Sequence, residues 1–174
     1  FESLESTHST LSTGSTEISY IDYALWQRDY LQGQVLAKLA HYWESQLESY
    51  EMLVLPADHQ RPSQIDYQGK DFCFELGKGL SNKLRVLAKN QETTLFTVLL
   101  SAYHTMLARL SGQQDIIVGT PFDNRNHAQT HSLLGFFTNA LPIRAQVDLS
   151  DNVENLISQL HQQVSQAKIH QEMP

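Results

Sequence analysis

Apolar residues recur at the spacing of an α-helix in five segments of the chain, and this pattern predicts five helices. The predicted helices cover residues 20–26, 34–49, 81–88, 95–110 and 151–164. Candidate N-caps stand at the expected starts of three of them: Ser81, the pair Thr93-Thr94, and Asp151 with Glu154. Gly112 is placed to end helix 95–110. Apolar side chains surround most of that helix, which predicts that it is buried on most sides.

Three further segments have strand patterns. Residues 71–76 and 141–147 alternate between polar and apolar side chains, as half-buried strands do. The continuous apolar run at 116–118 predicts a strand buried on both faces. Two prolines bracket an extended connector at 53–62, and residues 122–132 form a polar loop. The element order predicts a mixed α/β fold, an α+β two-layer sandwich.

The composition narrows the functional classes. A chain of 174 residues with 41% hydrophobic residues suits one domain, or one lobe of a larger one. Its net charge of -7 argues against a nucleic-acid partner, and it has no apolar run long enough for a membrane span. The single cysteine, Cys73, permits no internal disulfide, which favours the cytoplasm. Residues 1–17 are rich in Ser, Thr and Glu and are expected to form a flexible linker before a lobe at 18–174.

Four short segments carry more specific information. Tyr20–Trp26 resembles a Tyr-x-Asp-Tyr/Phe-Ala-Val-Trp box, and Gly135–Arg144 resembles Gly-x-Phe-Val-Asn-Thr followed by Arg. Val118–Asn126 resembles a Val/Ile-Gly-Thr/Ser-Pro-x-x-Asn-Arg loop, and His170–Pro174 resembles the start of His/Asn-Gln-Asp-x-Pro-Phe-Glu. The departures are single substitutions: Leu25 and Thr138 for Val, Ala140 for Thr, and Glu172 for Asp. Together these motifs resemble the signatures of the condensation domains of nonribosomal peptide synthetases, over residues 18–174.

The resemblance implies a fold similar to chloramphenicol acetyltransferase, with two lobes and a tunnel between them. It implies an enzyme that forms an amide between two substrates, each carried on the phosphopantetheine arm of a carrier domain, beside an adenylation domain of the same synthetase. The His-His-x-x-x-Asp-Gly motif of such domains is absent from this sequence. The chain therefore looks like the C-terminal lobe, truncated at both ends, without catalytic residues of its own. Its missing N-terminal lobe would carry the catalytic histidine.

Motif residues that could contact substrate are Asn139, Gly135, Arg125 and Arg144. The Asn139 amide could donate hydrogen bonds to a carbonyl or to a pantetheine amide, or it could pin the loop structurally. Either arginine could bind a phosphate or carboxylate, although a structural ion pair is favoured; the candidate partners are Asp22, Asp115 and Asp123. Gly119 and Gly135 are expected to allow a close backbone approach. His127 and His131 have i, i+4 spacing without a further ligand, so no metal is expected.

Two other functional classes remain open at this point. One is a non-catalytic, condensation-like module that recruits a partner, and the other is an epimerisation or heterocyclisation variant of the same scaffold. The state of the histidine motif upstream would separate the first from an enzyme. In every case, a lobe that packs on a partner lobe is expected to expose an apolar face, or to self-associate, when isolated.

Overall fold

The structure is a computed structural model that describes residues 18–59, 63–64 and 67–174. The linker predicted at residues 1–17 lies outside the described residues. The described elements, in chain order, are α1 (Tyr20–Tyr30), α2 (Gly33–Leu47), α3 (Lys78–Asn90), α4 (Leu95–Ser111), β1 (Asp115–Phe122), the short 3-10 helix η1 (Ala128–Thr130), β2 (Asn139–Gln146) and α5 (Val153–Ile169).

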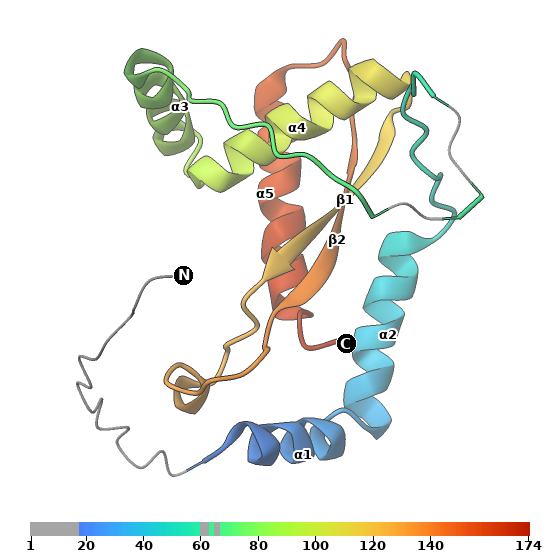
Figure 1. Ribbon diagram of the computed structural model, residues 1–174, viewed down its shortest axis with the longest axis vertical. Coiled ribbons are helices and arrows are strands. Elements are labelled where there is room, and N and C mark those ends of the chain that lie inside the picture. Colours follow the sequence, from blue (N-terminus) through green and yellow to red (C-terminus); the bar gives the residue numbers. More distant parts are fainter. Residues whose placement is uncertain (1–17, 60–62, 65–66) are drawn as a thin grey trace, which may run out of the picture.

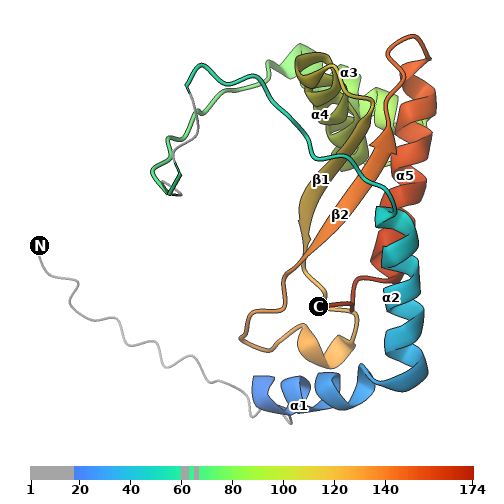
Figure 2. The same cartoon turned by 90° about the vertical axis from the view of Figure 1, so that its right-hand side faces the viewer.

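Strands β1 and β2 form an antiparallel ribbon at the centre of the molecule, with Thr120 opposite Leu141 and Ile116 opposite Ala145. Helices α4 and α5 pack on this ribbon, and Figure 1 shows α3 near one end of it and α1 near the other. Figure 2 shows α2 on the same side of the ribbon as α5. The mixed α/β arrangement predicted from the patterns is therefore present in the described residues, as helices layered against a small sheet.

The core lies between the ribbon and the helices. Leu141, Ile143 and Ala145 point to one face of β2, since alternate residues of a strand share a face, and they pack on Leu160 and Val164 of α5. Burying a large aliphatic side chain contributes roughly 1.5–3 kcal/mol, so this layer supplies much of the stability. His104 of α4 is fully buried in the same layer, where its ring nitrogens contact the carbonyl oxygens of Leu100 (2.9 Å) and Ile143 (3.3 Å). Burial lowers the pKa of His104, and since a neutral ring has a single N–H, only one of these two contacts can be a hydrogen bond in a given tautomer.

The ends of α4 follow the sequence prediction, whereas two other helix starts do not. Thr94 is the N-cap of α4, and Gly112 ends that helix in the left-handed conformation, at a φ of 72°. Ser81 lies inside α3, which begins after Gly77, and the Ser81 hydroxyl donates to the Leu76 carbonyl instead of capping the helix. The cap of α5 is Asn152, whose side chain accepts from the Glu154 amide, so the predicted box of Asp151 and Glu154 is wrong.

The strand predicted at 71–76 is absent from the described structure, and this prediction is wrong for the chain as it stands. Residues 67–77 form no ladder, and their apolar side chains face solvent, Phe72 being 87% and Phe74 73% exposed. Figures 1 and 2 show this segment running apart from β1 and β2. The alternation is a property of the local sequence, but a strand also needs a neighbouring chain to complete its hydrogen bonds.

Helix α4 is buried on one side only, which corrects the expectation that it is covered on most sides. Its buried side includes Val98, Leu100 and Leu107. Its other side is an apolar stripe that is 42–53% exposed, formed by Phe96, Leu99, Tyr103, Met106 and Leu110. These residues are spaced alternately three and four apart, so they form one continuous seam along the helix. An exposed apolar face was expected of an isolated lobe, and the α4 stripe confirms it.

We expect the isolated chain to self-associate through the α4 stripe, because burying a continuous apolar seam is favourable in water. The double variant Leu99→Gln and Met106→Gln should weaken association by about tenfold, since each side chain is roughly half exposed before contact. Sedimentation equilibrium measures the change. The matched control replaces two exposed apolar residues outside the stripe, Leu149→Gln and Ile169→Gln. A monomeric wild-type chain, or equal effects of both pairs, would contradict the prediction.

Candidate functional site

The first and second motifs meet at an aromatic cluster between α1 and the loop that enters β2. Helix α1 begins with a capping box, in which the side chains of Ser19 and Asp22 each bond the other's backbone amide. This start orients Tyr20 and Tyr23 toward Phe137, whose ring centroid lies 5.2 and 4.8 Å from theirs. The Tyr20 hydroxyl donates to the Phe136 carbonyl over 2.8 Å. Two motifs distant in sequence thus form one packed unit.

Gly135 lies directly against this cluster. A Cβ atom at position 135 would stand 2.2 Å from Cδ2 of Tyr20 and 2.8 Å from two further ring atoms. The ring cannot simply turn away, because its hydroxyl is bonded to Phe136 and its edge contacts Phe137. The close backbone approach expected of Gly135 is confirmed, and its physical cause is the Tyr20 ring. The same expectation for Gly119 is wrong, because a Cβ atom there would meet nothing within 4 Å among the described residues.

The fourth motif, at the end of the chain, binds to the start of β2. Asn139 donates both amide hydrogens, one to the Gln171 carbonyl at 2.9 Å and one to the Met173 carbonyl. The Gln171 side chain in turn donates to Oδ1 of Asn126 at 2.6 Å. Asn139 therefore fills the structural role that the sequence left open, and its N–H groups are occupied.

The geometry of Asn139 also determines what the rest of its side chain can do. Because both N–H groups point to the turn carbonyls, the carbonyl oxygen Oδ1 points away from them. Within the described residues, Oδ1 has no recorded hydrogen-bond partner. Asn139 lines a cavity of about 260 Å³ together with the apolar side chains of Trp43, Leu47 and Pro142. Asn139 can thus accept a hydrogen bond there, but it cannot donate one.

Glu172 connects the same turn to two other segments. Its Oε1 accepts from Nδ2 of Asn126 at 3.4 Å and lies 3.5 Å from Nε2 of His127. Its negative charge raises the pKa of the Tyr30 hydroxyl, to which it is also hydrogen-bonded. The carboxylate therefore joins α1, the loop after β1 and the chain end.

Helix α2 holds the other side of this turn. The indole of Trp43 donates to the His170 carbonyl over 3.0 Å, and the Tyr42 ring stacks on the His170 ring with centroids 3.7 Å apart. Burial raises the pKa of Tyr42. With these contacts, residues 170–173 touch α2, β2 and the loop after β1.

Arg125 is engaged within the loop after β1. Its Nη1 donates to the carbonyls of Thr130 and, at 3.1 Å, Leu133, and its guanidinium lies 4.1 Å from the centre of the Phe137 ring. A guanidinium over an aromatic face is a favourable cation–π contact. Arg125 thus braces the aromatic cluster through backbone carbonyls, and the expected ion pair with an aspartate is wrong for this residue within the described part of the chain. A direct substrate contact by Arg125 remains a prediction.

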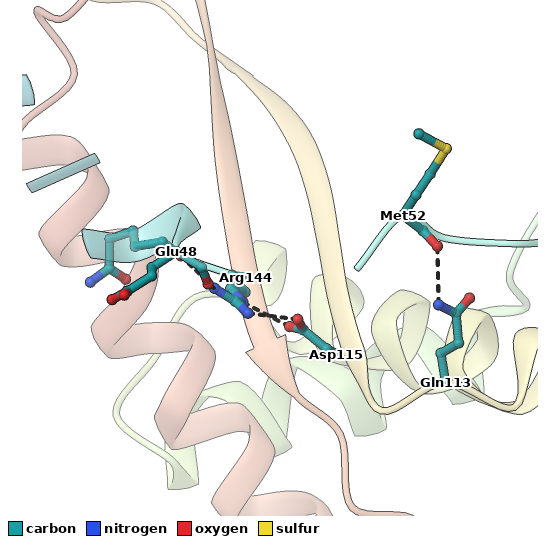
Figure 3. A network of polar contacts seen from close by, with 6 residues as sticks. Glu48, Met52, Gln113, Asp115 and Arg144 are labelled. Carbon is teal, nitrogen blue, oxygen red and sulfur yellow. Dashed lines mark hydrogen bonds and ion pairs between the residues drawn. The ribbon is translucent and has the colours of Figure 1, made fainter. Parts of the chain in front are cut away.

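Arg144 lies on the opposite face of β2 from the core and joins three segments (Figure 3). Its Nε and Nη2 donate to the two oxygens of Asp115, at 2.8 and 2.6 Å, in a bidentate pair. Its Nη1 donates to two carbonyls at the end of α2, that of Gln46 in the last turn (2.9 Å) and that of Glu48, which follows the helix (2.8 Å). Bonding to Arg144 lowers the pKa of Asp115. This is the ion pair with Asp115 that the sequence favoured, and a substrate contact by Arg144 likewise stays a prediction.

The Asp115–Arg144 pair predicts an acid dependence of stability. The folded pKa of Asp115 is depressed, so its contribution is present above the unfolded pKa of about 4 and is lost as the pH falls through the folded value. The wild type should therefore be more stable to unfolding than Asp115→Asn at pH 5, and this difference in the free energy of unfolding should shrink as the pH is lowered to about 2.5. The two pH values lie above and below the unfolded pKa of about 4. Urea unfolding at each pH measures it. A difference independent of pH would contradict an ionised Asp115 in the pair.

Some residues that hold the site together had no predicted role in the motifs. Asn126, Gln171 and Glu172 stood in quoted motifs without a role, and His127 was considered only as a metal ligand. The indication available in the sequence was that these residues are polar and stand at the ends of motifs. No pattern in the sequence could pair them, because the contacts join residues far apart in the chain.

The assembled site is a junction of aromatic and polar groups at one end of the sheet. It offers apolar surface, an amide oxygen, and backbone held by side-chain contacts. Among the described residues, none of the helices has the length and apolar character needed to cross a bilayer.

Comparison with known proteins places this junction in a family. The model of the family described as "Condensation domain" matches residues 1–174. N-(5-amino-5-carboxypentanoyl)-L-cysteinyl-D-valine synthase of Amycolatopsis lactamdurans is 37% identical over 92% of this chain, which spans only 4% of that synthase.

Two solved structures share the fold. A four-domain nonribosomal peptide synthetase, holo-AB3403, bound to AMP and glycine, matches 87% of this chain and 12% of its own, with 26% identity and a TM-score of 0.81. The condensation domain of the Monacolin K polyketide synthase MokA matches 88% of this chain and 37% of its own, with 28% identity and a TM-score of 0.68. These matches confirm the expected mixed α/β fold, and the chain belongs to the condensation domain family.

Proposed function

We propose that this chain forms one wall of the reaction tunnel in an amide-forming condensation domain of a nonribosomal peptide synthetase. The single observation that supports this most is the meeting of the family motifs at one junction, where Gly135 contacts Tyr20 and Asn139 binds the turn at 171–173. Similarity to a peptide synthase over 92% of the chain points in the same direction. The proposed piece is the C-terminal lobe, since the chain matches 37% of one solved condensation domain.

In the proposed reaction, the amine of an acceptor attacks the thioester carbonyl of a donor. A C–N bond forms, the C–S bond breaks, and the sulfur leaves as the thiol of the donor's phosphopantetheine arm after taking up the proton lost by the amine. A histidine in the other lobe would handle that proton. Both arms would reach the tunnel from carrier domains of the synthetase, in the cytoplasm beside an adenylation domain. Holding two tethered reactants together can remove roughly 7–11 kcal/mol of barrier.

Within this wall, Asn139 is the residue for which the geometry best supports a substrate contact. Asn139 lines an apolar cavity and its Oδ1 is left as an acceptor, so the residue suits an N–H donor such as a pantetheine amide. The sequence suggested that Asn139 donates hydrogen bonds to the substrate. Because its amide hydrogens are bonded to the Gln171 and Met173 carbonyls, we propose instead that its Oδ1 accepts one. Gly135, Arg125 and Arg144 would shape and brace the wall around it.

The experiment is amide formation by the complete parent domain with loaded donor and acceptor carriers, followed by mass spectrometry of the products. The complete domain should form the amide, and the 174-residue chain alone should not exceed the uncatalysed rate. Product formation by neither, with a folded parent and several carrier pairs, would reject the enzyme. Binding of a partner by such an inactive domain would favour the non-catalytic module instead.

Substitution of Asn139 tests its proposed contact in the same assay. Asn139→Leu removes the acceptor at similar size, and we expect kcat/KM per folded molecule to fall by about tenfold to a hundredfold, the equivalent of leaving one buried N–H unpaired. The matched control is Asn90→Leu on the exposed end of α3. A loss of stability with unchanged kcat/KM would show that Asn139 serves only to pin the turn.

A further inference from the structure

A cavity of about 440 Å³ lies between α1 and η1, beside the aromatic cluster but separate from the Asn139 cavity. Three rings line it, those of Tyr23 and Trp26 from α1 and of His127 at the start of η1. Asp22 and Gln129 add polar groups, one from each side. We call this cavity the α1–η1 groove. None of the proposed tunnel contacts uses it.

Trp26 supplies most of the aromatic surface of the α1–η1 groove. Its ring stacks on Tyr30 with centroids 4.9 Å apart and meets the His127 ring edge-on at 4.7 Å. These neighbours hold the indole in place, yet the residue is 39% exposed. Within the described part of the chain, the indole N–H has no recorded hydrogen-bond partner. A rigid, accessible indole with a free donor is an unusual surface feature for a residue that only packs.

Carboxylates stand at both ends of the aromatic surface. Asp22 lies one helical turn before Trp26, and its bonds from Ser19 lower its pKa, so it is ionised. Glu172 lies beside His127 at the other end, and its charge contributes to raising the pKa of Tyr23, after burial. The aromatic surface is therefore bracketed by negative charge.

A fixed positive charge beside the aromatic cluster, that of Arg125, is engaged by other groups. The Arg125 guanidinium donates to backbone carbonyls and lies over the Phe137 ring. His127 can add a positive charge only when it is protonated beside Glu172. Among the described residues, no lysine or arginine lines the α1–η1 groove. The net charge of -7 would further draw a cationic partner toward the chain.

We propose that the α1–η1 groove binds an arginine side chain presented by a partner protein segment. A guanidinium is flat, stacks on aromatic faces and matches a carboxylate fork, whereas a lysine ammonium is a strongly hydrated point charge. The chain already holds one guanidinium in this manner, Arg125 over Phe137. The backbone of the partner segment would supply a carbonyl to the free indole N–H. The inference does not depend on amide formation by the parent domain.

The test follows the indole N–H resonances of the complete 174-residue chain in ¹⁵N nuclear magnetic resonance spectra. Trp26→Phe assigns the Trp26 signal, and the buried Trp43 is the internal control. The probe is the peptide acetyl-Gly-Arg-Gly-amide, compared with the same peptide carrying citrulline, which is neutral but nearly isosteric, or lysine. We expect a saturable shift of Trp26 alone, and binding of the arginine peptide about fivefold tighter than that of the citrulline peptide.

Charge variants at the exposed Gln129 test the site without touching the packed residues. Gln129→Glu should tighten arginine-peptide binding by about two- to threefold, and Gln129→Lys should weaken it by a similar factor. The matched controls are Gln114→Glu and Gln114→Lys, the same changes at the opposite end of the sheet. Equal binding of the citrulline or lysine peptide, the absence of a Trp26 shift, or equal effects at positions 129 and 114 would each overturn the proposal.

Discussion

Arg144→Gln should lower the free energy of unfolding by about 2 kcal/mol, less than the roughly 3–5 kcal/mol for breaking a fully buried ion pair, because this pair is only partly buried. Asp115 and Arg144 are 12% and 20% exposed in their side chains, so the remaining carboxylate would stay largely desolvated without its partner. The variant also releases the carbonyls of Gln46 and Glu48, which Arg144 binds. Urea unfolding followed by circular dichroism measures the loss.

Two comparisons isolate the cause of this loss. Arg85→Gln, on the exposed side of α3, removes the same charge without a recorded partner and should change the free energy by less than about 0.5 kcal/mol. Adding Asp115→Asn to Arg144→Gln should cost little more, because it removes the orphaned charge. Strictly additive effects of the two single substitutions would mean that Asp115 and Arg144 are not coupled, and would contradict this explanation of the stability loss.

Gly135→Ala should destabilise the chain by about 2–3 kcal/mol, because the added methyl would overpack the junction of the first two motifs. The methyl would stand 2.2 Å from the Tyr20 ring, and moving that ring would break its hydrogen bond to the Phe136 carbonyl and its edge contact with Phe137. Thermal and urea unfolding measure the change. In the parent domain the same variant should also lower amide formation, if the junction shapes the tunnel.

The Tyr20 ring can be removed to test whether it causes this cost. In a Tyr20→Ala background, Gly135→Ala should cost less than about 0.5 kcal/mol, because the clash is gone. The matched control is Gly119→Ala in β1, where a Cβ atom meets nothing within 4 Å. An undiminished cost of Gly135→Ala without the Tyr20 ring would mean that the backbone, rather than packing, requires glycine at this position.

The site residues show how far motif reading could go. Gly135 was expected to allow a close approach, and a structural ion pair with one of three aspartates was favoured for Arg144; both hold in the structure, which selects Asp115 as the partner. Asn139 was assigned donors for a ligand, but its donors bind the turn carbonyls. The residue type told us which hydrogen bonds Asn139 can make, whereas only the folded chain shows which of them are already used.

The misplaced elements have a related explanation. The α4 caps, Thr94 and Gly112, could be read from the sequence because a cap bonds residues within one turn. The 71–76 alternation and the apolar stripe of α4 are equally clear in the sequence, yet neither finds its complement in the described chain. A pattern records which face of a segment avoids water, but it does not record what covers that face.

From its residues alone, this chain could be assigned its helices, its two paired strands, its condensation-domain motifs and the need for glycine at 135. These depend on local periodicity and on the chemistry of single residues. The meeting of Tyr20 with Gly135, of Glu172 with His127 and of Arg144 with α2 emerged only from the folded chain. Such contacts form when distant segments pack together, and their geometry depends on the whole arrangement of helices around the β1–β2 ribbon.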